Sequence, residues 1–497
     1  MGIVVRQSLK GSIAQYMGVI IGYVNLLYII PYYLSPEENG LFRLILETAS
    51  FFALFAQIGI PNAIPRFGPE FRSYGRERYL ERMSLLAPML SILTFILIYM
   101  IFFRSAFNHE IAKRSASYAQ YEWVLIPLGA FIVYTNILEN LIANHYRITI
   151  SKLSREVLLR VGIAVACFSY AYFGLTLESF FSVIGAVYFL IGALLLAYFF
   201  QIRQKGIQIA QTVQVPRKTF QSLGKFLALI VISGIGTNLV NKLDIFMVSS
   251  QIGLIDNAIY STAFLITMVI EVPSRSFQQI MAPIISEAIF QNNTRKIAWA
   301  YKKSSVGQSF IAVFILTIIL LNIGWVYDTM PNGALYKLGL PLIMLLGISK
   351  IFDAFTGING LILANSKYYY VGIYFTIGLA VIAIWLNNLL IPEFQLLGVA
   401  AATAMSIFLY NLIMSIYVWY KFRIHPFSKS SWHVLIFCAI SIIFLLINTL
   451  ISSQGLLEII ESIVFSILTL IYLYSFNVVR EIRFFLKKTL RFVWRRF

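Results

Sequence analysis

The sequence contains little charge and almost no cysteine. Only 12% of its 497 residues are Asp, Glu, Lys or Arg, whereas 59% are hydrophobic. A soluble domain usually contains about 25% charged residues, so this composition excludes an ordinary soluble protein. The two cysteines, Cys167 and Cys438, are far apart, and each lies in an apolar run. A disulfide framework and a thiolate metal site are therefore excluded as well.

Signatures of catalysis and of cofactor binding are also missing. The sequence has no Walker loop and no glycine-rich nucleotide fingerprint. The four histidines lie in predicted loops or at predicted helix ends, and none has a second histidine or cysteine at metal-ligand spacing: His109, His145, His425 and His433. We therefore predict no catalytic residue, no metal site and no cofactor, and an ATP-driven pump or a membrane enzyme is disfavoured.

The sequence contains instead a series of apolar runs separated by polar breaks. A helix needs about 20 mainly apolar residues to cross a bilayer, and the first such run, which ends at Leu34, is too long for the core of a signal peptide. The pattern predicts an all-α membrane protein with about fourteen transmembrane helices. These are expected near residues 10–34, 41–60, 84–103, 122–143, 156–174, 179–201, 225–250, 258–281, 305–326, 338–363, 369–390, 396–420, 432–452 and 458–477.

Basic residues are distributed unevenly between the two sides of these spans. If the amino terminus is cytoplasmic, the outer loops contain only four of the 39 Lys and Arg residues: Arg104, Lys113, Arg114 and Lys337. One predicted inner loop alone contains Arg66, Arg72, Arg76, Arg78 and Arg82. The positive-inside rule then places both termini in the cytoplasm. The net charge of +18 is thus an orientation signal that faces anionic lipid, not a nucleic-acid site, and residues 483–497 are predicted to form a cationic surface helix.

Two short motifs recur at nearly the same spacing. ENGLF (38–42) returns as DNAIY (256–260), and LIAN (141–144) returns as LILAN (361–365). The matching offsets at equivalent topological positions indicate a duplicated six-helix unit, as in transporters with a binding site between two halves. We predict a first lobe over 1–215, a second over 216–425, a central cleft between these pseudo-symmetric lobes, and two extra helices with a basic tail over 426–497.

Eight ionisable residues lie deep within the predicted spans: Glu47, Glu139, Lys242, Asp244, Glu271, Arg275, Lys350 and Asp353. A charge in the middle of a bilayer costs about 2.5–3.5 kcal/mol on insertion scales. These side chains must therefore face one another or water. Glu271 and Arg275 are four residues apart, which places them on one helix face in the favourable order, and Pro273 between them is expected to kink the helix.

The other deep charges also form local pairs in the sequence. Lys242 lies near Asp244, and Lys350 lies near Asp353. Each pair is either a structural ion pair that locks helices together or part of a functional site, and the sequence leaves both alternatives open. Polar residues continue these faces on the first, fourth, seventh and eighth spans: Asn25, Asn136, Asn241 and Gln278. The combined pattern predicts a hydrated cleft between the two halves.

The opening of the chain resembles a known family. LSPEENGLFRL (34–44) is similar to the loop before the second helix of the polysaccharide-unit flippases, the O-antigen branch of the multidrug, oligosaccharidyl-lipid and polysaccharide exporter superfamily. This resemblance implies a flippase of the bacterial cytoplasmic (inner) membrane. Its substrate would be an oligosaccharide linked to undecaprenyl pyrophosphate, moved to the outer leaflet by alternating access for surface polysaccharide biosynthesis, without an ATPase.

The resemblance also assigns roles to residues. Basic side chains would hold the pyrophosphate, with Arg43, Lys242, Arg275 and Lys350 as candidates. Sugar contacts are expected from Asn25, Asn136, Asn241 and Gln278. Coupling to H⁺ or Na⁺ is expected from Glu47, Glu139, Asp244, Glu271 and Asp353. Membrane lipids, a polysaccharide polymerase and glycosyltransferases are the implied partners.

Two other functions remain open at this stage. An ion-coupled drug or metabolite exporter would have the same fold, and the deep acids suit cationic substrates, whereas the deep bases argue against it. A membrane enzyme such as a polysaccharide polymerase is a more distant alternative, because it would need a large outer loop or an intramembrane histidine.

Overall fold

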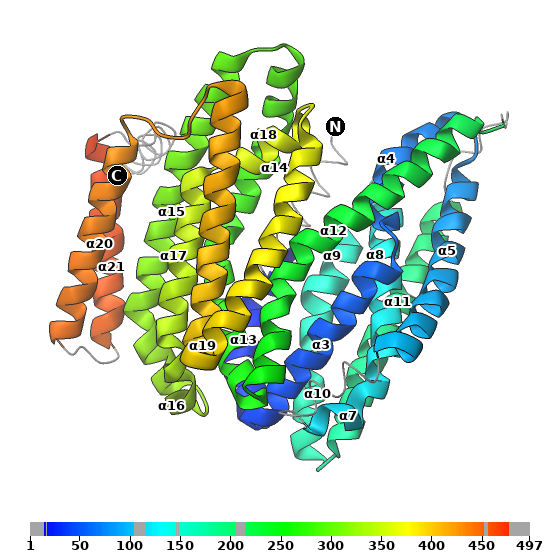
Figure 1. Ribbon diagram of the computed structural model, residues 1–497. Coiled ribbons are helices and arrows are strands. Elements are labelled where there is room, and N and C mark those ends of the chain that lie inside the picture. Colours follow the sequence, from blue (N-terminus) through cyan, green and yellow to red (C-terminus); the bar gives the residue numbers. More distant parts are fainter. Residues whose placement is uncertain are drawn as a thin grey trace, which may run out of the picture. The chain divides into compact units, whose positions relative to one another are not determined.

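The protein is described by a computed structural model that covers residues 14–15, 17–103, 116–145, 147, 149–204, 214–451 and 456–476. Within these ranges its regular structure is entirely helical (Figure 1), which confirms the predicted all-α class. The chain divides into two compact units. The first unit comprises Met1–Ser261 with Met330–Asn332, and the second comprises Thr262–Thr329 with Gly333–Phe497. The predicted lobe boundary between residues 215 and 216 rests on the repeat and stays a prediction.

The helices of the first unit begin with a short apolar segment that contains a π-helical turn. In chain order they are η1 (Asn25–Ile29), α2 (Ile30–Tyr33), α3 (Pro36–Ala56), α4 (Ile60–Ser73), α5 (Glu77–Ile98), η2 (Tyr99–Phe103), α7 (Ala116–Tyr121), η3 (Glu122–Val124), α8 (Leu125–Asn144), α9 (Thr149–Leu153), η4 (Ser154–Leu158), α10 (Leu159–Tyr172), α11 (Leu177–Gln204) and α12 (Arg217–Gln251). Helix α13 (Leu254–Thr267) starts in the first unit and ends in the second.

The second unit contains the longest helices of the chain. They are η5 (Met268–Ile270), α14 (Glu271–Phe290), α15 (Thr294–Thr329), α16 (Gly333–Tyr336), η6 (Lys337–Gly339), α17 (Leu340–Thr356), α18 (Asn359–Asn365), α19 (Tyr369–Phe422), α20 (Ser431–Ile451) and α21 (Leu456–Phe476).

Nine helical segments of the described ranges are long and apolar enough to cross a membrane, and Met17–Tyr33 is a shorter apolar helix. The prediction of a multi-pass membrane protein is therefore confirmed. The count of fourteen spans and the cytoplasmic placement of both termini stay predictions. The basic segment 483–497 and three of the outer-loop cations, Arg104, Lys113 and Arg114, lie outside the described residues.

Two predicted features differ from the structure. The arginine-rich stretch after the second span is not a loop, because α4 occupies residues 60–73 and α5 begins at Glu77. Buried α4 residues recur at helical spacing, at Ile60, Ile64, Phe67 and Phe71, so this basic segment is an amphipathic helix. The predicted span 338–363 ends earlier, at Thr356, before Gly357 at φ +66°.

The long helix α19 covers two predicted spans, 369–390 and 396–420. Gln395 interrupts it with φ 48° and ψ −124°. This residue lies between the two predicted spans, so the sequence placed the turn correctly. The structure therefore contains two helical segments where the sequence predicted two.

Helix α3 begins with a capping box. Ser35 accepts a hydrogen bond from the backbone N–H of Glu38 (3.2 Å), and the Glu38 carboxylate accepts one from the backbone N–H of Ser35 (2.8 Å). Pro36 occupies the first position of the helix, where no backbone N–H is needed. Tyr170 of α10 also donates to Glu38 (2.6 Å). The SPEE segment thus fixes the start of α3 and ties it to α10.

The repeated motifs ENGLF and DNAIY contact each other inside the first unit. Asn257 is fully buried, and its side-chain amide donates to the carbonyl oxygen of Gly40 (2.9 Å). A methyl group on Gly40 would meet the carbonyl oxygen of Leu254, so α3 and α13 approach closely because this residue has no side chain. The two copies of the motif therefore form one helix-packing contact.

Aromatic side chains pack α20 and α21 against α15. The rings of Phe310 and Phe437 stack at a centroid distance of 4.1 Å, and Phe465 of α21 lies 5.8 Å from Phe437. Polar contacts add to this core, because the Asn322 side chain donates to Ser462 (2.6 Å). The two helices outside the predicted repeat are thus part of the packed second unit.

We predict that Gly40→Ala lowers the stability of the protein by about 1–3 kcal/mol, the usual cost of overpacking a tight contact. Gly224→Ala is the matched control, because Gly224 lies in α12 with nothing within 4 Å of an added methyl group, and alanine favours a helix. Thermal unfolding of the detergent-solubilised protein compares the two variants. An unchanged unfolding temperature for Gly40→Ala would contradict the close contact.

Candidate functional site

The first unit contains a polar cavity of about 350 Å³. Its wall comes from α3, α4, α8, η4 and α12, and its polar lining residues are Ser50, Gln57, Asn62, Asn136, Arg155 and Lys242. Among the described residues that line the cavity, two are cations and none is an acid. The cavity is therefore a candidate site for an anionic, hydrogen-bonding ligand.

Helical spacing explains how α3 and α8 supply this lining. On α3, residues 47, 50, 54 and 57 recur at intervals of three and four, so they share one face of the helix. On α8, residues 132, 136 and 139 follow the same rule. The side-chain amide of Asn136 donates to the side-chain oxygen of Gln57 (3.3 Å), which joins the two faces.

Two backbone irregularities shape the other walls of the cavity. Ile58 and Gly59, which lie between α3 and α4, both have positive φ (47° and 67°), and α4 then starts with Asn62 in its first turn. Arg155 lies in the π-helical turn η4. Such turns are rare and often occur at functional sites, because they change the direction of side chains within a helix.

Each cation of the cavity forms an ion pair with a glutamate. Arg155 donates to Glu139 of α8 (3.0 Å), and Lys242 of α12 donates to Glu47 of α3. The Arg155 side chain is 54% exposed, whereas that of Glu139 is only 13% exposed. The guanidinium group therefore faces the cavity and the carboxylate lies behind it.

A second cluster of charges lies in the second unit. Glu271 accepts hydrogen bonds from Arg275 (2.8 Å) and from Lys350 of α17. Lys350 is buried, and its ammonium group lies 5.6 Å from the centre of the Phe264 ring. The predicted pair of Glu271 and Arg275 is thus confirmed, and one carboxylate serves two cations.

A short 3-10 turn lies beside Pro273, where the sequence predicts a kink. The turn η5 interrupts the helix at Met268–Ile270, directly before Glu271. Pro273 has no backbone N–H to donate to the carbonyl of Val269, and its ring would collide with that carbonyl in a regular helix. The interruption therefore lies where the proline requires it.

The structure corrects two of the predicted ion pairs. Lys350 pairs with Glu271 and not with Asp353, which instead accepts a hydrogen bond from Asn411 (3.0 Å). Lys242 pairs with Glu47 and not with Asp244, which accepts from the hydroxyl of Tyr260 (2.6 Å). Lys242 and Asp244 are two residues apart on a helix and therefore point in different directions. Lys350 reaches Glu271 on a neighbouring helix although Asp353 is only three residues away.

Asp353 belongs to a network of neutral polar groups in the second unit. The Asn411 side chain donates to Asp353, and its own oxygen accepts from Thr356 (2.9 Å) and Asn359 (3.3 Å). The network joins α17, α18 and α19. No basic side chain of the described chain lies within ion-pair distance of Asp353, which distinguishes it from Glu47, Glu139 and Glu271.

The remaining predicted residues occupy different surroundings. Asn25 is buried and donates to the backbone carbonyl of Arg160 (2.7 Å). Arg43 is half-buried on α3, one turn before Glu47, and Gln278 is exposed on α14. Asn241 belongs to α12, but its side chain lies outside the described residues. The structure therefore places Asn136 and Lys242 in the wall of the cavity, whereas Glu139 and Glu47 are paired with the lining residues Arg155 and Lys242.

Sequence reasoning missed four residues of the cavity: Ser50, Gln57, Asn62 and Arg155. The polar stripe that begins at Arg43 and Glu47 extends through Ser50 and Gln57 at helical spacing, and this signal was available. Arg155 lies one residue before the predicted span 156–174 and was assigned to the inner loop. Its role depends on the π-helical turn, which no spacing rule predicts.

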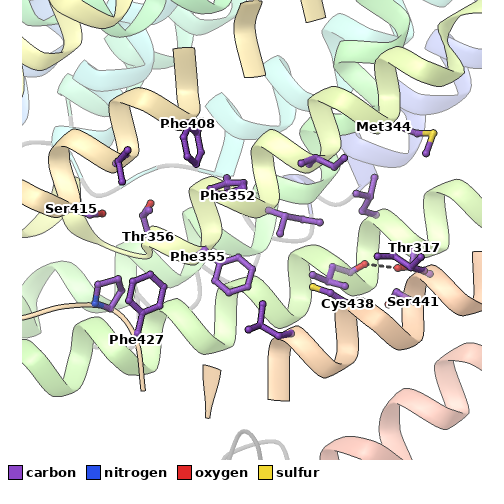
Figure 2. A pocket seen from close by; sticks show the side chains of 18 of the residues that line it. Thr317, Met344, Phe352, Phe355, Thr356, Phe408, Ser415, Phe427, Cys438 and Ser441 are labelled. Atoms are coloured by element: carbon purple, nitrogen blue, oxygen red, sulfur yellow. Dashed lines mark hydrogen bonds between the residues drawn. The ribbon is translucent and has the colours of Figure 1, made fainter. Parts of the chain in front are cut away.

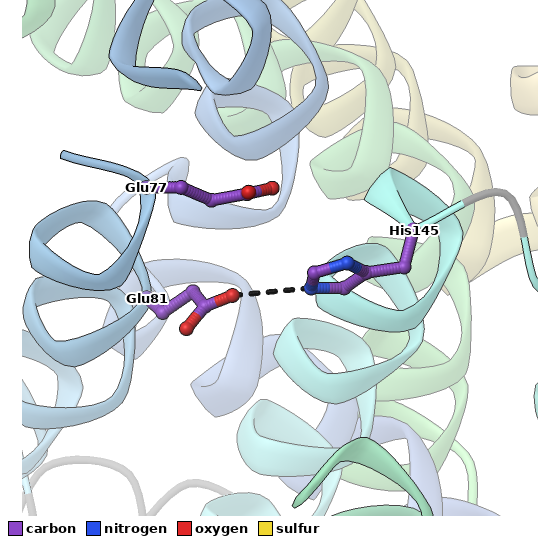
Figure 3. A group of neighbouring side chains, drawn as sticks. All are labelled: Glu77, Glu81 and His145. Atoms are coloured by element: carbon purple, nitrogen blue, oxygen red, sulfur yellow. Dashed lines mark hydrogen bonds and ion pairs between the residues drawn. The ribbon is translucent and has the colours of Figure 1, made fainter. Parts of the chain in front are cut away.

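Three side chains at one end of the first unit lie at distances that suit a metal ion (Figure 3). The ligand atoms of Glu77, Glu81 and His145 all lie within 4.8 Å of one another, and His145 Nε2 is 3.1 Å from Glu81. Two arginines already neutralise the acids, with Arg72 2.6 Å from Glu77 and Arg203 2.8 Å from Glu81. A divalent ion would be repelled by these cations, so the cluster is an ionic contact between helix ends.

The second unit contains a larger, apolar cavity of about 800 Å³ (Figure 2). Phe352 and Phe355 of α17, Phe408 of α19 and Phe427 after α19 surround it, and α15 and α20 complete the wall. Several lining residues are exposed, including Ile442 at 57%. The cavity therefore opens at the surface of the unit, where it can take up an apolar chain.

The fold is shared with several solved transporters. The lipid II flippase MurJ, in an inward closed conformation, has a TM-score of 0.72 at 14% sequence identity, over 94% of this chain and 99% of that chain. An inward-facing multidrug resistance MATE family transporter of the MOP superfamily has a TM-score of 0.66 at 14% identity, over 82% and 94% of the chains. A MOP superfamily transporter from Pyrococcus furiosus has a TM-score of 0.56 at 14% identity, over 85% and 95%.

Sequence comparison identifies the family. No curated protein sequence matches the chain. The family model of polysaccharide biosynthesis proteins matches residues 4–290, which is more than half of the chain. The chain therefore belongs to the polysaccharide biosynthesis protein family, and it has the fold of MurJ and of the MATE transporters of the MOP superfamily.

Proposed function

We propose that the protein is a flippase for a lipid-linked oligosaccharide. The substrate would be attached to undecaprenyl pyrophosphate and would move from the cytoplasmic to the outer leaflet of the bacterial cytoplasmic membrane by alternating access, in the manner of O-antigen flippases. The observation that carries this proposal is the polar cavity of the first unit, which is lined by Arg155 and Lys242 without a described acid. Family membership and a fold shared with a lipid II flippase support it.

The cavity has the chemistry that a saccharide diphosphate needs. A guanidinium group suits phosphate oxygens because it presents paired N–H donors, and a lysine adds a point charge. The amide side chains of Gln57, Asn62 and Asn136 are both donors and acceptors, so they suit sugar hydroxyls. Of the four cations proposed to hold the pyrophosphate, Lys242 is the one that lines this cavity. Arg43, Arg275 and Lys350 remain proposed contacts from other parts of the passage.

The apolar cavity of the second unit suits the lipid part of such a substrate. Its wall is aliphatic and aromatic, and it is open to the surface. A prenyl chain would pack against these side chains through van der Waals contacts, as lipid tails do. The second unit by itself therefore contains an apolar site that suits the lipid part of the substrate.

Asp353 is the strongest of the proposed coupling residues. Glu47, Glu139 and Glu271 are each neutralised by a cation, whereas the Asp353 carboxylate accepts a hydrogen bond from the Asn411 amide and has no described basic side chain within ion-pair distance. A carboxylate in such surroundings can bind H⁺ or Na⁺ without losing an ion pair. Asp244 and the three paired glutamates remain proposed members of the coupling system.

The main alternative is an ion-coupled exporter of cationic drugs or metabolites. The MATE transporters show that this fold also serves multidrug resistance. A cationic substrate would need an acid in the wall of the cavity, and the described lining contains Arg155 and Lys242 but no acid. The charge of the described lining therefore favours an anionic substrate.

We predict that Arg155→Gln and Lys242→Gln each lower substrate affinity about tenfold or more, because a hydrogen bond to a charged group contributes about 1.5–3 kcal/mol. Surface polysaccharide is measured in cells that depend on the variant, at matched protein levels. Arg295→Gln is the control, since Arg295 is exposed and outside both cavities. Full export by both cavity variants would refute the proposed function.

A second prediction concerns the apolar cavity. Leu412→Trp adds bulk to its wall, whereas Leu389→Trp places the same side chain on an exposed part of α19 outside the cavity. We expect Leu412→Trp to reduce export severalfold, because a filled cavity loses room for a prenyl chain, and Leu389→Trp to leave export unchanged. Surface polysaccharide at matched protein levels is again the measurement, and equal export by the two variants would argue against this cavity.

A further inference from the structure

The two cations of the polar cavity are not available to a ligand as they stand. Arg155 is paired with Glu139 at 3.0 Å, and Lys242 is paired with Glu47. Each ion pair joins one cation to one carboxylate, so the four side chains together carry no net charge. An anion that enters the cavity therefore meets cations whose strongest hydrogen bonds are already made.

In each pair the cation lines the cavity and the glutamate is not among the lining residues. The exposures differ, because Arg155 is more exposed than Glu139 (54% against 13%), whereas Glu47 is more exposed than Lys242 (34% against 18%). Each pair joins two separate elements, η4 with α8 and α12 with α3. The neighbouring acid of η4, Glu156, forms its own ion pair with Arg160 (3.0 Å). The structure thus assigns one glutamate to each cavity cation.

We propose that Glu47 and Glu139 are internal competitors that occupy the two cations until the substrate diphosphate displaces them. This inference rests on the proposed function and adds the mode of binding. The diphosphate binds by exchange, taking over the hydrogen bonds of both cations, and the glutamates return to the cations when the substrate leaves. Glu47 and Glu139 are then residues that set specificity, in addition to the coupling role that the family resemblance implies.

Exchange explains how the cavity discriminates between anions. A small monovalent anion can replace only one glutamate at a time. Its interaction with the cation is no stronger than that of the carboxylate that it displaces. A diphosphate carries several charged oxygens and can contact both cations at once, which converts the second exchange into an intramolecular event. The cavity should therefore bind pyrophosphate much better than phosphate.

The test measures binding of inorganic pyrophosphate to the purified full-length protein in lipid nanodiscs by calorimetry, with inorganic phosphate as the competing probe. We expect Glu139→Gln and Glu47→Gln to bind pyrophosphate about tenfold more tightly than the natural protein, the factor for one charge-assisted hydrogen bond. The same variants should also bind phosphate measurably, because a single anion no longer has to displace a carboxylate.

Glu287→Gln is the matched control. Glu287 also pairs with a lysine, Lys296, at 2.9 Å, but it is exposed and lies outside the cavity. The hydrogen bond from Lys296 holds the pKa of Glu287 below its usual range, so this control also removes a negative charge at neutral pH. Its affinity for pyrophosphate should equal that of the natural protein. Unfolding temperatures show whether each variant is folded, and the two glutamates provide independent variants.

The outcomes separate this inference from the proposed function. If Arg155→Gln and Lys242→Gln lose pyrophosphate binding and the glutamate variants gain it, exchange is supported. If the cation variants lose binding while Glu139→Gln and Glu47→Gln bind as the natural protein does, the exchange is refuted and the proposed function stands. If the cation variants retain full binding, or if no variant binds pyrophosphate, the cavity is not the diphosphate site and both proposals fail.

Discussion

Charges in apolar surroundings have to be neutralised, and this requirement determines how the polar residues of both units are arranged. An unpaired charge in the middle of a bilayer costs about 2.5–3.5 kcal/mol, and removing one partner of a buried pair leaves the other uncompensated. In the first unit α3 and α8 each supply a glutamate that neutralises a cation of another element. In the second unit Glu271 neutralises both Arg275 and Lys350. Ion pairs therefore join elements that are distant in the sequence.

In the first unit, the chemistry of the cavity depends on which partner of each ion pair lines it. Arg155 and Lys242 line the cavity, whereas Glu47 and Glu139 are not among its described lining residues. A lining that contained the glutamates in place of the cations would suit a cationic ligand. A fold shared by a lipid II flippase and a multidrug transporter leaves both options open.

Much of this site was within reach of the sequence, because some of its geometry is local. The pair of Glu271 and Arg275 follows from the rise and turn of a single helix, and the polar stripe of α3 follows from the same periodicity. The role of Arg155 could not be predicted from the sequence. This residue lies at the edge of a predicted span, and a π-helical turn brings it to the cavity. The partner of Lys350 was also out of reach, since Glu271 lies 79 residues away on another helix.

The sequence by itself determined that this protein is an all-helical, multi-pass membrane protein, because low charge and long apolar runs permit no other solution in a bilayer. It also determined which residues carry charge into the membrane. Only the tertiary structure decided which of them meet, as with Lys242 and Glu47, which are 195 residues apart. The physical reason is that the hydrophobic pattern of a helix specifies which face is buried, whereas the partner of a buried charge depends on the packing of whole helices against one another.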